Sequence, residues 1–301
     1  MKIYIIQVPA LLQPETQLIR YPAHNKKYDY EQDFLIWINK QKNLITDNQA
    51  EADWHYLPVY WTRWHINHGF ASNGEGLPQL QEEVNKIIID DTKTFTIALF
   101  DGGPLINIGK TVVFNANRTT NDCIDIPLIC SPHLKPILRV KKKYLASFNG
   151  SFETHPIRVE MKNRLKANPD VLIGGGLPTR FYKRWFWAKN YNLNMMASYV
   201  ALSPRGTGCT SFRFFEAMQL GVAPCLIGDV DVRPFRKFIP WDEMSYYVST
   251  VDELEKLLEN LDKQEAAEKG KKAFLYWKNE FNYQKWGKYV LMELANLSFK
   301  K

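Results

Sequence analysis

One segment of the chain sets arginines, glycines and a glutamate between two apolar runs: SPRGTGCTSFRFFEAMQLGVAPCLIGD, residues 203–229. Its apolar spacing predicts a helix with Arg213 in the first turn. A cation there opposes the positive end of the helix dipole, at a cost of roughly 0.3–1 kcal/mol. A bound diphosphate reverses the sign, because the helix N-terminus, Arg205 and Arg213 would all attract it. The segment therefore predicts a diphosphate site.

Glu216 follows Arg213 by three residues and shares its face of the predicted helix. A carboxylate beside a phosphate site suits a ribose, because it accepts hydrogen bonds from paired hydroxyls. Glu216 therefore indicates a nucleotide diphosphate. A surface ion pair between Arg213 and Glu216 is the alternative, and the sequence leaves it open.

The loop before this helix has the composition of a ligand-binding turn. Gly206 and Gly208 allow a sharp turn and a close approach to a ligand, and either Thr210 or Ser211 is placed to cap the helix. Gly221 is the expected C-terminal stop. With an apolar run on each side, the pattern predicts a βαβ unit, and ligands of open α/β sheets bind at the carboxyl ends of such strands.

Short apolar runs alternate with segments of helical spacing along the rest of the chain. This alternation predicts parallel sheets with crossover helices, in two doubly wound halves rather than one barrel. The predicted strands are residues 3–8, 54–60, 95–100, 144–148, 170–173, 199–202, 223–227 and 246–248. The predicted helices are residues 30–43, 80–91, 157–167, 212–220, 251–261 and 265–297.

The composition limits the possible partners. The formal net charge is +7 with scattered lysines, which favours a cationic pocket on a soluble protein over a nucleic-acid binder. Four dispersed cysteines without a CxxC pair argue against a disulfide scaffold and against zinc held by thiolates. The apolar run at residues 3–8 is too short for a signal peptide or a membrane span. We expect no nucleic-acid partner, no membrane span and a cytoplasmic location.

Residues 203–229 resemble the donor-binding signature of exostosin-like glycosyltransferases, family 47: a Pro-Arg-Gly turn, Ser-Phe-Arg, Glu-Ala, then Gly and Pro before a strand. Two further blocks, EADWHYLPVYW and KKYLASFNGSFETHPIRVEMKNRL, are similar to blocks of that family in the same order. The resemblance runs from about Glu51 to about Trp241.

The resemblance implies an α/β fold of the GT-B class, with two Rossmann-like domains facing a central cleft. It implies an acceptor-side domain over residues 1–138 and a domain that binds the nucleotide sugar over residues 139–270. Residues 271–301 are expected to form a helix that packs back on the first domain. The seam is set by the prolines and the lysine run of residues 131–145.

The same resemblance implies an inverting transfer from a nucleotide-diphosphate sugar, most simply a UDP-sugar, to a hydroxyl of an oligosaccharide acceptor. Arg205 and Arg213 would bind the diphosphate and Glu216 the ribose, with no obligatory metal or other cofactor. We expect neither the membrane anchor nor the second transferase domain that animal members have. A microbial cell or a virus-infected host cell is therefore the expected setting.

An inverting transfer needs a base that takes the proton of the acceptor hydroxyl. FTIALFDGGP places Asp101 after a predicted strand of the first half, beside two glycines. The family commonly has His-Asp-x-Gly here, whereas this chain has Phe100 in place of the histidine. A structural turn or helix cap is the alternative for Asp101. Asp53 and Glu153 are second choices for the base.

Arg158 follows Pro156 in the first turn of a predicted helix, so the dipole argument predicts that it too contacts an anion, the same diphosphate. His65 and His68 have the spacing of one helical face, but no third metal ligand is evident, so we expect acceptor-side contacts or surface positions.

Two other functions compete. Asp229 and Asp231 match the form of the metal-binding motif in GT-A transferases, which would make the enzyme metal-dependent. Alternatively, the chain is a non-catalytic relative that binds a glycan or a nucleotide.

Overall fold

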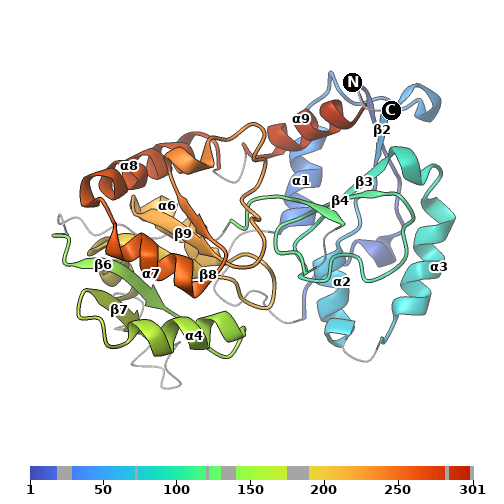
Figure 1. Ribbon diagram of the computed structural model, residues 1–301. Coiled ribbons are helices and arrows are strands. Elements are labelled where there is room, and N and C mark those ends of the chain that lie inside the picture. Colours follow the sequence, from blue (N-terminus) through green and yellow to red (C-terminus); the bar gives the residue numbers. More distant parts are fainter. Residues whose placement is uncertain are drawn as a thin grey trace. The chain divides into compact units, whose positions relative to one another are not determined.

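The computed structural model of the chain divides into two compact units, drawn in Figure 1. Unit 1 comprises Met1–Ile126 with Tyr283–Lys301, and unit 2 comprises Pro127–Asn282. The predicted seam after residue 138 lies outside the described residues. The structure describes residues 1–18, 29–71, 74–119, 122–129, 140–174, 190–281 and 285–298.

Unit 1 is built around a five-stranded parallel sheet of strand order β1-β2-β3-β4-β5. Its strands are β1 (Ile3–Ile5), β2 (Trp54–Tyr56), β3 (Thr94–Ala98), β4 (Val112–Asn115) and β5 (Cys123–Asp125). Its helices are α1 (Tyr30–Asn39), α2 (Trp61–Asn67), α3 (Leu77–Ile87) and α9 (Gly287–Ser298). The predicted strand 54–60 ends at Tyr56, two residues before Pro58, which has no N–H for a ladder. Strands β4 and β5 were not predicted.

The C-terminal helix α9 belongs to unit 1. The Trp286 ring beside its first residue packs against the Phe34 ring on α1, with centroids 5.5 Å apart. At the other end of α9, Trp54 Nε1 donates to Ser298 Oγ at 2.9 Å. The single predicted helix over residues 265–297 is in fact two helices, because α8 (Lys263–Asn279) ends before α9 begins and lies in unit 2.

Unit 2 contains a second five-stranded parallel sheet, of order β10-β9-β8-β6-β7. Its strands are β6 (Tyr144–Asn149), β7 (Val171–Gly174), β8 (Ser198–Pro204), β9 (Ala223–Ile227) and β10 (Tyr246–Val248). Its other helices are α4 (Pro156–Leu165), α6 (Phe212–Leu220) and α7 (Val251–Glu259). The chain runs first to one side of β6 and then to the other, so the strand order reverses between β6 and β8.

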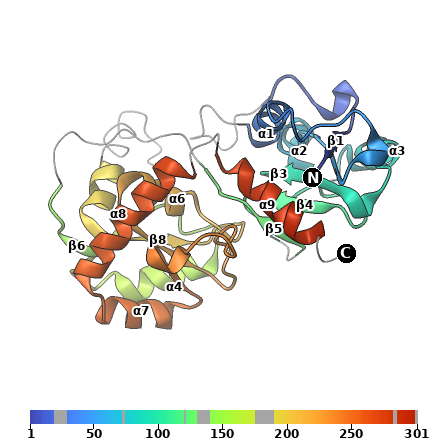
Figure 2. The same cartoon turned by 90° about the horizontal axis from the view of Figure 1, so that it is seen from above.

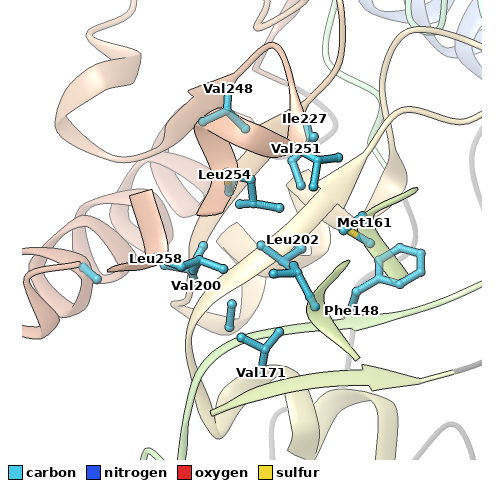
Figure 3. Packing of buried hydrophobic residues seen from close by; sticks show 14 residues of the cluster. Phe148, Met161, Val171, Val200, Leu202, Ile227, Val248, Val251, Leu254 and Leu258 are labelled. Atoms are coloured by element: carbon cyan, nitrogen blue, oxygen red, sulfur yellow. The ribbon is translucent and has the colours of Figure 1, made fainter. Parts of the chain in front are cut away.

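This reversal puts helices on both faces of the sheet, α4 and α7 on one and α6 and α8 on the other (Figure 2). Figure 3 shows the core between the sheet and the first pair of helices. There Leu202 of β8 and Leu254 of α7 are fully buried. Each such leucine stabilises the fold by roughly 1.5–3 kcal/mol.

The predicted architecture of two Rossmann-like units with parallel sheets, that of the GT-B fold, is confirmed. Among the described residues, no helix has both the length and the apolar character needed to cross a membrane.

Candidate active site

The strand-order reversal of unit 2 brings two loops together at one edge of the sheet. One loop joins β6 to α4, and the other joins β8 to α6. Because β6 and β8 are neighbouring parallel strands, both loops leave from their carboxyl ends. Ligands of open α/β sheets bind in the crevice at such a switch point. The sequence-predicted donor residues lie on these two loops and on the helices that follow them.

Helix α6 begins as the sequence predicts and presents its N-terminus to this edge. Ser211 has extended N-cap geometry, and Gly221 ends the helix in the left-handed region with φ 73°. Of the two candidate caps, Thr210 and Ser211, the backbone of Ser211 takes the N-cap position, but its hydroxyl makes no capping bond and instead accepts from Nη1 of Arg213 at 3.3 Å. No acidic residue lies in the first turn, so the positive end of the helix dipole is not offset there.

Arg213 extends away from α6 and lies across the end of β6. Its Nε donates to the carbonyl of Asn149 at 2.6 Å, and its guanidinium carbon lies 4.7 Å from the centroid of the Phe148 ring. Arg213 makes no ion pair with Glu216, so the alternative of a surface pair is wrong for the described residues. The cation at the start of α6 is held by a carbonyl and a ring and remains uncompensated.

Arg205 follows the end of β8, where its backbone N–H donates to the Ile227 carbonyl of β9 at 2.9 Å. Its guanidinium forms an ion pair with Asp229, whose side chain is 65% exposed while that of Arg205 is 12% exposed. The hydrogen bond from Arg205 holds the pKa of Asp229 below its usual value. Nε of Arg205 is buried without a hydrogen-bond partner.

Arg158 in the first turn of α4 is buried and binds backbone rather than a carboxylate. It donates to the carbonyls of Arg205 at 2.8 Å, of Pro204 at 3.0 Å and of Ser151 at 3.0 Å. Burial, followed by the nearby charge of Arg213, lowers the pKa of Arg158 to about 10, so the group stays protonated at neutral pH.

Glu216 is buried in the second turn of α6, where its carboxylate accepts a hydrogen bond from the Tyr191 hydroxyl. Tyr191 lies in the helical residues 190–196 that precede β8, and the sequence analysis did not single it out. Thr210 is buried at the end of the loop. Neither Gly206 nor Gly208 has a positive φ, so the backbone conformation does not require a glycine at either position.

His155 is a second residue of this region that the sequence analysis missed. Its side chain caps α4, with Nδ1 accepting from the Ile157 N–H at 3.2 Å. Burial lowers the pKa of His155, and the charges of Arg205 and then Arg158 lower it further, against an opposing effect of Asp229. The signal was present in the sequence, because a polar residue directly precedes Pro156 at the start of the helix.

Both carboxylates of the competing metal motif, Asp229 and Asp231, are paired with arginines. Asp231 accepts from Arg233 at 2.9 Å and 2.8 Å, and Asp229 is paired with Arg205. Across the described ranges, no three His, Cys, Asp or Glu side chains come together in a group able to hold a metal ion. The geometry thus does not favour the GT-A interpretation.

Asp101 lies in unit 1, three residues after the last residue of β3. One of its carboxylate oxygens accepts from Asn117 Nδ2 at 2.6 Å. Gly103 has φ 65°, so the loop depends on a glycine there. Of the second choices, Asp53 precedes β2 and therefore lies at the amino end of the sheet, and Glu153 is exposed on the β6–α4 loop of unit 2.

His65 supports the same loop of unit 1. The ring is fully buried on α2, its Nε2 lies 3.2 Å from the Gly103 carbonyl, and its centroid lies 4.8 Å from that of Phe100. Burial lowers the pKa of His65 to about 4, so the imidazole is neutral at pH 7 and Nε2–H is the donor. The expectation of a surface or acceptor-contacting His65 is wrong.

Glu31 is a buried carboxyl group that the sequence analysis missed. Its Oε1 accepts from the Thr62 N–H at 3.2 Å, the Thr62 hydroxyl at 2.7 Å and the Leu99 N–H at 3.2 Å. Burial, followed by the charge of Asp29, raises its pKa to about 7. Its spacing with the buried Phe34 and Ile38 puts an acid on the apolar face of α1, a signal present in the sequence.

Exostosin-1 and a plant xylosyltransferase are two of the known proteins to which this chain is similar. Exostosin-1 of Drosophila melanogaster is 30% identical over 124 residues, 35% of this chain and 16% of that protein. Probable beta-1,4-xylosyltransferase IRX10L of Arabidopsis thaliana is 22% identical over 306 residues, 84% of this chain and 68% of that protein. The chain spans only 16% to 25% of the length of the first three relatives, exostosin-1 among them.

Among solved structures, TarM aligns with 74% of this chain and 58% of its own, at 13% identity and a TM-score of 0.38. The family evidence is stronger. The sequence model of the Exostosin GT47 domain matches residues 83–261, more than half of the chain. That span covers β3 with Asp101, both loops of the switch point, and α6. The chain therefore belongs to the exostosin GT47 family.

Proposed function

We propose that this protein is an inverting glycosyltransferase that moves a sugar from a nucleotide diphosphate, most simply UDP, to a hydroxyl of a glycan acceptor. The observation that carries the proposal is the charge at the switch point of unit 2. Arg158, Arg205 and Arg213 gather there beside the N-terminus of α6, and among the described residues Asp229 is the one carboxylate that forms an ion pair with any of them. Family membership supports the same activity.

The leaving group of such a transfer is the nucleotide diphosphate, on which negative charge develops as the sugar departs. Arg205, Arg213 and the first-turn N–H groups of α6 would stabilise that charge, so the transfer needs no obligatory metal. The Glu216 carboxylate accepts a hydrogen bond from the Tyr191 hydroxyl. It would accept further hydrogen bonds from the ribose hydroxyls.

The acceptor hydroxyl must lose a proton as it attacks the anomeric carbon from the face opposite the diphosphate. We propose Asp101 as the base, because it follows a parallel strand, at the carboxyl end of the sheet of unit 1. Attack from the opposite face inverts the configuration of the anomeric carbon.

The donor assignment is tested by thermal shift with UDP, GDP, UMP and uridine on the wild type and on Arg205→Ala and Arg213→Ala. We expect UDP to raise the melting temperature of the wild type well above the effect of UMP, and both variants to lose most of that difference. If neither UDP nor GDP shifts the wild type, the donor site is wrong. Binding of UDP without transfer from any UDP-sugar would instead indicate a non-catalytic relative.

A further inference from the structure

One buried side chain joins the two loops of the switch point. Two of the carbonyls that accept from the Arg158 guanidinium, those of Pro204 and Arg205, belong to the end of β8 and the loop after it. The third, that of Ser151, belongs to the β6–α4 loop. A single planar group therefore spans both loops at the place where the strand order reverses.

Only arginine can make this set of bonds. The guanidinium offers its N–H donors in a fixed plane, whereas a lysine ammonium is a single point at the end of a flexible chain. The acceptors are backbone carbonyls, and within the described residues no carboxylate forms an ion pair with Arg158. A buried cation without an ionic partner is destabilising unless its hydrogen bonds are satisfied, which the three carbonyls do.

Arg158 is buried, so the residues beside it, and not Arg158 itself, would contact a ligand. Its side chain is 6% exposed. A Cβ at Gly206 would lie 3.1 Å from Nη2, and the Phe148 ring centroid lies 5.7 Å from the guanidinium carbon. The same ring contacts the Arg213 guanidinium, at 4.7 Å, so Arg158 lies next to both arginines that are expected to bind the donor.

We propose that Arg158 is a positioning residue of the donor site, which holds the backbone of Arg205 against the β6–α4 loop so that the Arg205 side chain reaches the diphosphate. The inference rests on the proposed function, because the site is the same one. It replaces the direct contact with the anion that the sequence predicted for Arg158.

The test uses Arg158→Lys, which keeps the positive charge but cannot bridge three carbonyls. Isothermal titration measures the affinities for UDP and for UMP. We expect UDP to bind about tenfold more weakly, the size of a lost hydrogen bond to a charged group, and the ratio of UDP to UMP affinity to fall. Arg164→Lys is the matched control, since Arg164 lies on the same helix and is paired with Asp252 and Glu255; it should bind UDP as the wild type does.

A double-mutant cycle separates positioning from direct contact. If Arg158 acts through Arg205, adding Arg158→Lys to Arg205→Ala weakens UDP binding by less than about twofold. In the Arg213→Ala background the full tenfold loss should remain. A further tenfold loss in the Arg205→Ala background would show that Arg158 has its own contact and would overturn the inference, whereas absence of UDP and GDP binding by the wild type would overturn the proposed function first.

Should Arg158→Lys fail to fold by circular dichroism, Gly206→Ala gives the same information. It adds a methyl group 3.1 Å from Nη2 of Arg158 and removes no charge. We expect it also to lower the ratio of UDP to UMP affinity, and to have little further effect once Arg205 is alanine. Wild-type ratios in Gly206→Ala would overturn the inference.

Discussion

Gly150 and Arg213 are in direct contact: a Cβ at position 150 would lie 1.9 Å from Nη2 of Arg213 and 2.5 Å from its guanidinium carbon. Gly150 is the residue after β6, and its φ is not in the left-handed region. A glycine is thus required there by the space that the guanidinium fills and not by backbone strain. The arginine that starts α6 and the glycine that ends β6 form one element of the donor site.

Gly150→Ala is expected to displace the Arg213 guanidinium without removing it. UDP affinity should fall at least tenfold, approaching that of Arg213→Ala, because the charge no longer lies at the end of β6. Isothermal titration measures the effect. Gly69→Ala in unit 1 is the control for a strained glycine substitution, because φ is 63° there and no heavy atom lies within 4 Å of the added carbon; it should lower the melting temperature and leave UDP affinity unchanged. Wild-type affinity in Gly150→Ala would show that Arg213 does not bind the donor in this position.

Asp229 is expected to compete with the donor for Arg205. Its carboxylate is paired with that guanidinium, and a diphosphate must replace it. Asp229→Asn should therefore raise UDP affinity roughly two- to fivefold, the equivalent of an exposed ion pair of up to about 1 kcal/mol. Because the pairing lowers the pKa of Asp229, mild acid should not reproduce the effect.

The control for this variant is Asp231→Asn. Asp231 lies two residues further on and accepts from the buried Arg233, so its loss should lower the melting temperature and leave UDP affinity unchanged. Weaker UDP binding by Asp229→Asn would mean that the bound donor uses this carboxylate, contrary to competition.

Glu31 is expected to make stability depend on pH. Its pKa is raised from 4.5 to about 7 in the fold, so the fold favours the protonated form. The stabilising contribution is complete below pH 4.5 and is lost as the pH rises through 7. Urea unfolding at pH 5, 6, 7 and 8 should show the wild type losing stability relative to Glu31→Gln as the pH rises. The exposed Glu51→Gln should show a constant difference, and a constant difference for Glu31→Gln would contradict the expectation.

The predictions from sequence were most accurate where the signals are local. The unit from β8 to β9 was predicted within two residues at each boundary, and α6 and its stop at Gly221 were predicted correctly. Residues close together in the sequence signal each of these features: an apolar run signals a strand, a helical spacing a helix, and a glycine the end of the helix. The arrangement of two parallel α/β units followed from the alternation of these elements.

The role of Arg158 could not be read from the sequence. Two of its three acceptors lie 46 and 47 residues away, and every residue has a backbone carbonyl, so no residue type marks the partners. The helical pattern correctly placed Arg158 in the first turn of α4, but the dipole argument does not distinguish an anion from carbonyls as the partner of a cation there. Ser211, one of the two candidate caps, does not cap α6 with its side chain, because its hydroxyl accepts from Arg213 and not from the helix backbone.

The assignment of the base leads to the sharpest kinetic prediction. Asp101→Asn keeps an oxygen that can accept from Asn117, so the loop after β3 should retain its conformation while the group loses its ability to take a proton. We expect kcat to fall by at least about a hundredfold, the usual contribution of general base catalysis, with UDP affinity unchanged. Initial rates with a UDP-sugar and an oligosaccharide acceptor measure the first, and isothermal titration the second.

The two other carboxylates considered for this role serve as matched controls. Asp53 accepts from the Lys2 backbone N–H at 2.6 Å, at the amino end of β2, and Glu153 is exposed in unit 2. Since ligands of a parallel sheet gather at the carboxyl ends of its strands, Asp53→Asn should leave kcat unchanged. A hundredfold loss of kcat in Glu153→Gln, together with a normal kcat in Asp101→Asn, would move the base to the β6–α4 loop. Unit 2 would then supply both the cations that stabilise the leaving group and the carboxylate that accepts the proton.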